Sequence, residues 1–334
     1  MIRLTQRSLG AAGAMLMLWG LSSGCMLGHE MARMRLADGE AALAANRLEV
    51  ALAEFREAVE LDPHFAEGHY KLGLVYRQQG QLAQAADALQ EAVRLDPTQV
   101  APIIELADVY RLLDRMTQAI RAYLMACDLD PRNFELRFRL ATCYHQTGEL
   151  ERAVESYQEA IKLDPRNAFA RSNLGAALTA LGRHYEAIKA YKESLECNQA
   201  QPLVLVNLAT VYLNQERWET AHRTLKVALQ LDPNLAAAHE RLGYTLWREG
   251  AYDAAAESYR RAIELDPQNA PAHAGLGVVL MTQYLDNPER VALRDDAVES
   301  WHRSLELRPD QPKLRALVEK YRPKAERPAI DLES

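Results

Sequence analysis

Four polar side chains recur with a constant period of 34 along the sequence and could together bind a polypeptide. They are Arg139, Asn173, Asn207 and Arg241. A side-chain amide offers both a donor and an acceptor, which is what a peptide group requires. A guanidinium can bind a carboxylate through two parallel hydrogen bonds. We predict that these residues form a polar row that binds a peptide. The alternative left open is that such positions simply face solvent.

The other reactive side chains form no catalytic pattern. The sequence has no Gly-rich phosphate loop, no pair of His residues at metal-binding spacing and no nucleophile elbow. The cysteines Cys127, Cys143 and Cys197 are expected to be small buried hydrophobes, and a bridge between Cys127 and Cys143 stays open as an alternative. We therefore predict no enzymatic activity, no cofactor and no metal site.

The elements that must position the polar row also repeat. The tripeptide Leu-Asp-Pro recurs with the same period, except that one copy is missing at Cys197. It begins at Leu61, Leu95, Leu129, Leu163, Leu231 and Leu265. A fixed period of this size indicates a repeat architecture. Proline lacks an N–H and disfavours helix at the preceding residue, so each tripeptide is expected to end a helix.

Within each repeat unit, the apolar positions predict two packed helices. Counting from residue 32, position 7 is Leu in every unit but the first, position 8 is Gly or Ala, and position 20 is always Ala. Spacings of three and four place such positions on one helical face. Small residues at positions 8 and 20 allow the two helices to approach closely.

This pattern resembles the tetratricopeptide repeat, although the Trp of that family at position 4 is replaced, for example by His69, His239 and His273. The resemblance implies an all-α, right-handed superhelical solenoid of eight helix-turn-helix units over residues 32–311. It also implies a groove lined by the first helices, where Asn side chains bind the backbone of an extended peptide. The groove residues that it implies are Phe138, Arg139, Asn173, Val206, Asn207, Thr210, Arg241, Tyr244 and Trp247, with Phe169, Leu203 and Leu213 nearby.

The C-terminal part departs from the strict period. An insertion near residues 285–292 is expected to lengthen the connection between the two helices of the eighth unit, as a surface loop or as a partner contact. Residues 311–322 form an amphipathic pattern that predicts a capping helix. Residues 323–334 are expected to be a disordered tail.

The N-terminus has the layout of an export signal. Arg3 and Arg7 precede an apolar run that is too short to span a bilayer as a helix. The stretch "LSSGC" resembles the lipobox of bacterial lipoproteins, which implies cleavage of residues 1–24 and a lipid on Cys25. Residues 25–31 would then be a short tether, and Met26 implies sorting to the outer membrane. The alternative is a simple secretory signal.

The net charge of the chain limits the classes of partner that it can bind. The formal net charge of −7 offers no electrostatic basis for binding nucleic acid. We predict a non-enzymatic, lipid-anchored scaffold that faces the periplasm from the outer membrane and binds a protein or peptide partner, in a pilus, secretion or cell-wall complex. Two alternatives remain, a regulator of a peptidoglycan hydrolase and a carrier of an apolar ligand.

Overall fold

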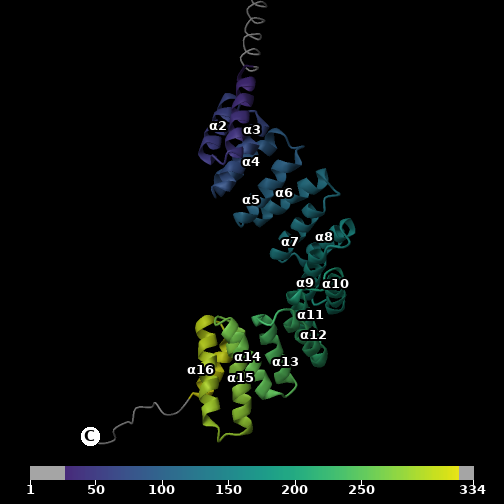
Figure 1. The fold of residues 1–334 in the computed structure, drawn as a ribbon, viewed down its shortest axis with the longest axis vertical. Coiled ribbons are helices and arrows are strands. Elements are labelled where there is room, and N and C mark those ends of the chain that lie inside the picture. Colours follow the sequence, from purple (N-terminus) through teal and green to yellow (C-terminus); the bar gives the residue numbers. More distant parts are fainter. Residues whose placement is uncertain (1–26, 323–334) are drawn as a thin grey trace, which may run out of the picture. The chain divides into compact units, whose positions relative to one another are not determined.

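The computed structural model describes residues 27–322, and in that range every regular element is a helix (Figure 1). The chain divides into two units, Met1–Asp164 and Pro165–Ser334, and each is described by itself below. The prediction of an all-α repeat fold is confirmed. The predicted signal peptide, Cys25 and the predicted tail lie outside the described residues.

A helix over residues 27–44 comes first. It is followed by α2 (Leu48–Leu61), α3 (Ala66–Gln78), α4 (Leu82–Leu95), α5 (Val100–Leu112), α6 (Met116–Leu129), α7 (Phe134–Gln146), α8 (Leu150–Leu163), α9 (Ala168–Ala180), α10 (His184–Cys197), α11 (Pro202–Asn214), α12 (Trp218–Leu231), α13 (Ala236–Arg248), α14 (Tyr252–Leu265), α15 (Ala270–Asp286), α16 (Val291–Leu307) and α17 (Pro312–Tyr321). Among these described helices, none has the length and apolar character needed to cross a bilayer.

Consecutive helices pack as pairs because small residues face each other across them. The Ala at position 20 is fully buried in every repeat. In the repeats that have Gly at position 8, a side chain there would collide with the second helix: a Cβ on Gly175 would lie 2.8 Å from the Tyr191 ring, and one on Gly277 would lie 2.4 Å from Trp301. In these repeats the bulky residue at position 24 therefore fills the space that the missing side chain leaves.

In the first seven repeats, the turn between the two paired helices depends on one left-handed residue. Gly80, Gly148, Gly182 and Gly250 have φ between 73° and 80° at position 15. The repeats without Gly adopt the same conformation, with φ of 55° at Asn46 and 57° at Asp114 and Glu216. Because a side chain is strained at positive φ, Gly is the favoured residue here, and the fold accommodates the exceptions.

The Leu-Asp-Pro tripeptide builds the turn between repeats. Its Asp accepts a hydrogen bond from the backbone N–H two residues later, as Asp96 does from Thr98 at 3.1 Å. In four repeats, the His or Arg at position 4 of the next repeat reaches back to the carbonyl of the Pro. The ring Nε2 of His239 lies 3.0 Å from Pro233 O, and Arg171 Nη2 donates to Pro165 O at 2.8 Å. The position-4 His residues are thus structural.

A hydrogen-bonded Ser–Gln pair replaces the tripeptide where it is missing. The Oγ of Ser194 donates to Ala168 O at 2.8 Å, and the amide of Gln201 donates to the carbonyls of Ser194 and Asn198 at 3.0 and 2.7 Å. The same pairing recurs after α16, between Ser304 and Gln311. In both places Ser stands at position 27 where other repeats have Ala, and the sequence pattern alone did not reveal this Ser–Gln pair.

The insertion in the eighth repeat is helical, which corrects the expectation of a longer connection. Helix α15 has 17 residues and α16 also has 17, whereas α13 and α14 have 13 and 14. The inserted residues therefore extend both helices by about a turn each, and only four residues, 287–290, join them. Asn287 and Pro288 form the turn, since Asn287 accepts from the N–H of Glu289 at 3.2 Å.

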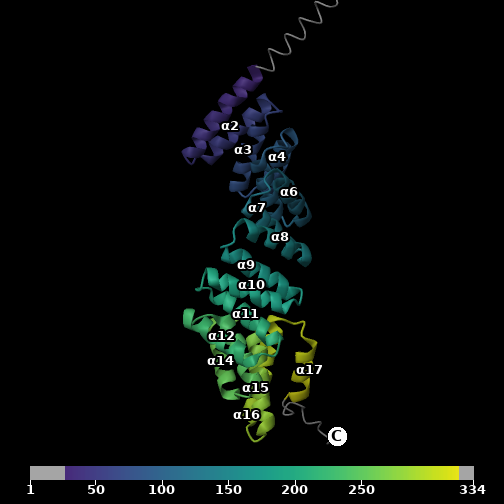
Figure 2. The same cartoon turned by 90° about the vertical axis from the view of Figure 1, so that its right-hand side faces the viewer.

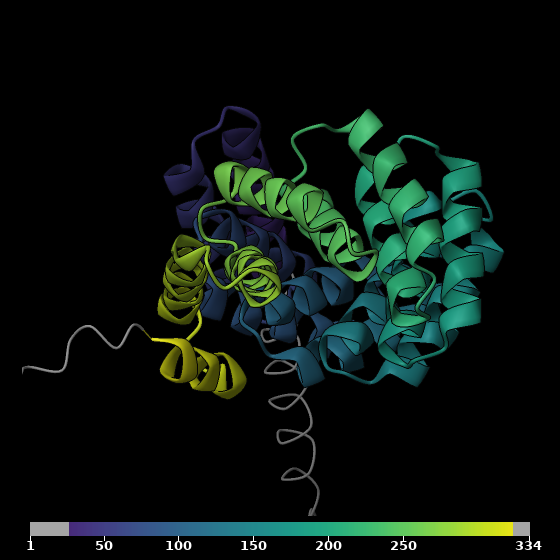
Figure 3. The same ribbon diagram turned by 90° about the horizontal axis from the view of Figure 1, so that it is seen from below.

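Both ends of the array carry additional packing. Helix α17 lies beside α16 and buries Leu314 and Val318 (Figures 2 and 3). At the other end, residues 27–31 of the predicted short tether are helical and belong to the first helix. There the Nδ1 of His29 lies 2.6 Å from Asp62 Oδ2, and its ring meets Phe65 edge-on.

Candidate functional site

The first helices carry the predicted polar row, which we describe separately for the two units. We call the side of α3, α5 and α7 that carries position 6 the first-helix face of unit 1, and the equivalent side of α9, α11, α13 and α15 the first-helix face of unit 2. Of the four predicted residues, Arg139 belongs to unit 1, and Asn173, Asn207 and Arg241 belong to unit 2.

On the first-helix face of unit 1, each position-6 charge is paired with a charge from the preceding repeat. Lys71 pairs with Glu40, Glu105 with Arg77, and Arg139 with Asp108. These partners stand at position 9 or 12 of the repeat before. The polar groups of this face therefore neutralise one another.

Asp108 is the centre of this network. It is buried, with 9% of its surface exposed, and it accepts hydrogen bonds from the Tyr123 hydroxyl and from Arg139. Arg139 also donates to Glu135 at 2.7 Å. Burial and the bond to Asp108 raise the pKa of Tyr123. Burial acts to lower the pKa of Arg139, but its two carboxylate partners outweigh it, and the pKa is raised.

A hollow of about 560 Å³ lies over this network. It is lined by Arg77, Asp108, Arg111, Leu112, Glu135, Phe138, Arg139 and Thr142. The predicted groove residue Phe138 stacks on Phe134 with ring centroids 5.7 Å apart and also meets Tyr157 at 5.8 Å. Its ring is therefore engaged by its neighbours.

The first-helix face of unit 2 has different chemistry. Within residues 27–322, neither the amide of Asn173 nor that of Asn207 has a hydrogen-bond partner. The residues at positions 9 and 12 before Asn207 are Ala176 and Thr179, which carry no charge. One helical turn before each Asn lies a large apolar side chain on the same face. Phe169 is 71% exposed and Leu203 is 60% exposed.

Helix α13 contributes a charge pair and an aromatic group to the same unit. Arg241 Nε lies 3.3 Å from Glu240 Oε2. Burial raises the pKa of Glu240 and outweighs the opposing effect of Arg241. The ring of Tyr244 lies 5.9 Å from Trp247, whose Nε1 donates to Thr282 Oγ1 at 3.3 Å.

The remaining predicted groove residues are less open than the pattern indicated. Val206 and Leu213 are buried. The Thr210 hydroxyl donates to Val206 O at 2.9 Å, within its own helix. The open part of the face thus consists of Phe169, Asn173, Leu203 and Asn207, with the partly exposed Arg241 on the neighbouring first helix.

The cysteines are all free in the described chain. Cys127 and Cys143 are buried in unit 1, and burial raises the pKa of Cys143 to about 11. Cys197 is exposed, which corrects the expectation that it would be buried. It lies where the tripeptide is missing, at the end of α10.

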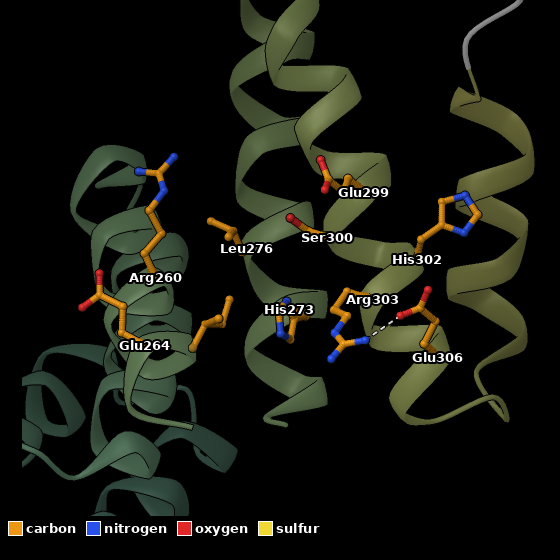
Figure 4. A pocket seen from close by; sticks show the side chains of 10 residues that line it. Arg260, Glu264, His273, Leu276, Glu299, Ser300, His302, Arg303 and Glu306 are labelled. Atoms are coloured by element: carbon orange, nitrogen blue, oxygen red, sulfur yellow. Dashed lines mark hydrogen bonds and ion pairs between the residues drawn. The ribbon is translucent and has the colours of Figure 1, made fainter. Parts of the chain in front are cut away.

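A second hollow, of about 530 Å³, lies between α14, α15 and α16 (Figure 4). Several of its polar side chains are bound to other groups: His273 Nε2 lies 3.2 Å from Pro267 O, and Arg303 pairs with Glu306 at 2.7 Å. Over residues 27–322, no cluster of three His, Cys, Asp or Glu residues is arranged to hold a metal ion.

The residues that the sequence analysis missed have a signal in the spacing. Asp108 and Arg139 are opposite charges at a sequence separation of 31, and Glu40 and Lys71 share that separation. Arg77 and Glu105 are separated by 28. With a period of 34, these spacings join position 9 or 12 to position 6 of the next repeat. A search for opposite charges at these two spacings finds the unit 1 network.

Comparisons with known proteins agree with this architecture. No curated protein sequence matches the chain. A tetratricopeptide repeat protein from Parabacteroides merdae is 16% identical over 77% of this chain and 98% of its own, with a TM-score of 0.61. A chain of the APC/C hetero-tetramer Cut9-Hcn1 is 20% identical over 86% of this chain and 55% of its own, with a TM-score of 0.57. Pseudomonas aeruginosa pilF is 22% identical over 62% of this chain and 94% of its own, with a TM-score of 0.50.

The sequence also matches a family model. The model described as the Cilia and flagella-associated protein 70 C-terminal domain matches residues 10–278. Repeats of this kind act typically as non-enzymatic scaffolds for contacts between proteins. The paired helices, the repeat period and this match lead to one conclusion: the chain belongs to this tetratricopeptide repeat family.

Proposed function

We propose that the protein is a non-enzymatic scaffold, held at the bacterial envelope by a lipid on Cys25, and that the first-helix face of unit 2 binds an extended segment of a partner protein. The observation that carries the binding proposal is the pair of unpartnered amides, Asn173 and Asn207, each beside an exposed apolar side chain. Donors and acceptors that are unused within the chain are available to a ligand.

The geometry of the repeats fits an extended peptide. Helices α9 and α11 are neighbours in unit 2. Packed helices lie about 8–10 Å apart, and an extended chain advances about 3.3 Å per residue. The two amides therefore address peptide groups about three residues apart. Phe169 and Leu203 contact apolar side chains of the same segment, and Arg241 offers a guanidinium to a carboxylate farther along.

The anchor proposal is based on the N-terminal sequence. The stretch "LSSGC" after a basic and then apolar segment supports acylation of Cys25, and Met26 supports an outer-membrane location facing the periplasm. Two or three acyl chains bind a membrane firmly, at ~0.8 kcal/mol per buried CH₂. The scaffold thereby recruits its partner to the envelope.

Site-specific photocrosslinking in the native envelope tests the binding proposal. A photoreactive phenylalanine replaces Phe169 on the first-helix face of unit 2, or Tyr185, which is 83% exposed on α10. We expect a discrete protein adduct from position 169 and none from position 185. The adduct should disappear when Asn173→Ala and Asn207→Ala are added, because the amides that orient the peptide are gone.

A matched control variant tests whether the loss of any two exposed amides is enough to abolish the adduct. Gln158→Ala with Gln230→Ala removes two exposed amides from the second helices α8 and α12, and we expect the adduct to persist. An adduct that survives the loss of Asn173 and Asn207 in a folded protein contradicts the proposed site. Metabolic labelling with a fatty acid tests the anchor separately, and Cys25→Ser should abolish the label.

A further inference from the structure

The first helix, over residues 27–44, exposes an unusual apolar stripe. Leu27, Met31 and Met34 are 62%, 43% and 67% exposed. Their spacing of four and three residues places them on one helical face. Three large apolar side chains in contiguous positions at the end of a repeat array are a feature that requires a covering partner or a specific role.

The other repeats show what this face does elsewhere. In the later first helices, position 10 is buried in every repeat and position 7 is buried in all but one. A Cβ on Gly68 at position 3 would lie 3.1 Å from Val59 of the preceding repeat. Position 3 is buried in every later repeat, at Gly68, Pro102, Leu136, Ala170, Val204, Ala238 and Ala272. In the first repeat these positions are Met34, Asp38 and Ala41, and all three are exposed.

The stripe is confined to the end of the helix that lies nearest to Cys25. The terminal repeat of an array needs a polar outer face for solubility. Asp38, where later repeats have Leu, meets this need in the second half of the helix, and Ala41 exposes only a methyl group there. The first half keeps Leu27, Met31 and Met34, so the face changes from apolar to polar with distance from Cys25.

The helix cannot turn this stripe inward. Its opposite side is fully committed to the array, with Ala32 and Leu36 buried. Gly39 lies so close to Phe55 that a Cβ there would be 2.5 Å from the ring. The contact between His29 and Asp62 fixes the first turn. The orientation of the stripe is therefore set by the packing of the first repeat.

We propose that Leu27, Met31 and Met34 insert into the lipid surface that holds the Cys25 acyl chains, so that the first repeat docks on the membrane in a fixed orientation. This inference rests on the proposed acylation of Cys25. Only Met26 lies between Cys25 and Leu27, so the two residue steps that join them reach at most about 7 Å. An amphipathic helix at a membrane buries its apolar face about 5–10 Å into the headgroup region, which this reach allows.

The gradient along the helix favours lipid over a second copy of the chain. A helix that packs on another helix continues its apolar stripe through the contact, at i, i+3, i+4, i+7 and i+8. Here the apolar character stops at Met34, about 10 Å along the axis from Leu27 at 1.5 Å per residue. A membrane surface touched at one end of the helix accounts for this limited extent. Three exposed side chains add little to the hold of the acyl chains, so their role is to orient the array.

Depth-dependent quenching on the acylated, full-length mature protein tests this inference. The protein is reconstituted into vesicles of phosphatidylethanolamine and phosphatidylglycerol, in a Cys197→Ser background that removes the exposed thiol. A fluorophore is attached at Met34→Cys or, two turns farther along the same face, at Ala41→Cys. Quenchers are carried either on lipid acyl chains or in water.

We expect lipid-borne quenchers to act at least about twofold more strongly on the probe at 34 than on the probe at 41, because only the first lies at insertion depth. Equal and weak lipid quenching at both positions, with the protein still bound to the vesicles, overturns the inference while the acyl anchor stands. Protection of the probe at 34 from aqueous quencher without lipid quenching identifies a second copy as the occupant and also overturns it. Absence of acylation and of vesicle binding removes the anchor itself.

Discussion

The same position of the repeat carries opposite chemistry in the two units. In unit 1, Lys71, Glu105 and Arg139 are each bound to a charge of the preceding repeat. In unit 2, Asn173 and Asn207 have no partner among the described residues, and exposed Phe169 and Leu203 lie beside them. The charged groups of the unit 1 face are paired within the chain, whereas the two amides of the unit 2 face remain available to a ligand.

This difference shows how a repeat separates stability from binding. A hydrogen bond or ion pair formed between neighbouring repeats strengthens their interface, which is where an array gains its stability. A polar group that stays unpaired adds nothing to the interface but remains available to a partner. The first-helix faces can therefore be altered independently, and each alteration has a distinct expected effect.

The largest effect on stability is expected from Asp108→Ala. This substitution leaves the buried Tyr123 hydroxyl without its acceptor and removes one of two partners of Arg139. We expect a loss of about 2–3 kcal/mol in the free energy of unfolding, measured by urea denaturation. Asn207→Ala, the matched change on unit 2, should cost less than about 0.5 kcal/mol because it breaks no bond. Equal losses in the two variants contradict the contrast.

The open face can be closed by copying the unit 1 arrangement. Ala176→Asp with Asn207→Arg places in unit 2 the two side chains that stand at equivalent positions as Asp108 and Arg139. A half-exposed ion pair should change stability by no more than about 1 kcal/mol. The crosslink from position 169 should nevertheless be lost, since Asn207 is replaced by a group that binds within the chain. Retention of the crosslink excludes a role for Asn207 in binding.

Two carboxylates, Glu240 in unit 2 and Asp62 in unit 1, should change the free energy of unfolding with pH in opposite directions. Burial raises the pKa of Glu240 in unit 2, so its contribution is fully present below about pH 4.3 and falls as the pH rises through the raised value. Burial also acts on Asp62 in unit 1, but hydrogen bonds from His29 and the His64 N–H outweigh it and lower the pKa. Its contribution is present above about pH 3.9 and falls as the pH decreases.

Urea midpoints at pH 4 and pH 7 test this assignment. Compared with wild type, Glu240→Gln should raise the urea midpoint more at pH 7 than at pH 4, because the variant has no buried charge at pH 7. An Asp62→Asn variant should lose stability at pH 7 and approach the wild-type value at low pH. A Glu240→Gln variant that behaves like wild type at both values shows that the burial of this carboxylate does not govern the pH response.

Thiol alkylation should perturb the protein least, and it distinguishes the cysteines of unit 1 from that of unit 2. Cys127 and Cys143 are buried in unit 1, and Cys197 is exposed in unit 2. Of the three cysteines in residues 27–322, we expect only Cys197 to react rapidly with iodoacetamide at pH 7, since the thiolate is the reactive form and burial raises the pKa of the other two. Their alkylation in urea then reports the unfolding of unit 1 alone. Rapid reaction of Cys143 in native protein contradicts the described packing.

Much of the fold follows from the sequence because the repeat reduces it to a one-dimensional register. The Ala at position 20 and the Gly or Ala at position 8 specify a local contact that every repeat shares, and the Leu-Asp-Pro turns specify one that six repeats share. The eighth repeat was harder, since residues 285–292 fit a loop as well as two longer helices. Only the structure shows that α15 and α16 absorb them.

The candidate site was less predictable for a physical reason. Register places a side chain on a face but does not say whether a neighbour satisfies it. Arg139 and Asn207 share position 6, yet one is bound to Asp108 and the other has no partner among the described residues. The same limit applies to Cys197, which the register placed on a second helix but which lies at its exposed end.

The central claim is that the unpartnered amides of unit 2 bind the partner, and quantitative recovery of the crosslinked partner tests it most directly. Wild type, Asn173→Ala with Asn207→Ala, and Gln158→Ala with Gln230→Ala are compared at equal expression. Loss of two hydrogen bonds should weaken binding by about 1–3 kcal/mol, so the first variant should lose most of the adduct while the second keeps it. Undiminished recovery from the folded Asn173→Ala, Asn207→Ala variant would contradict the account.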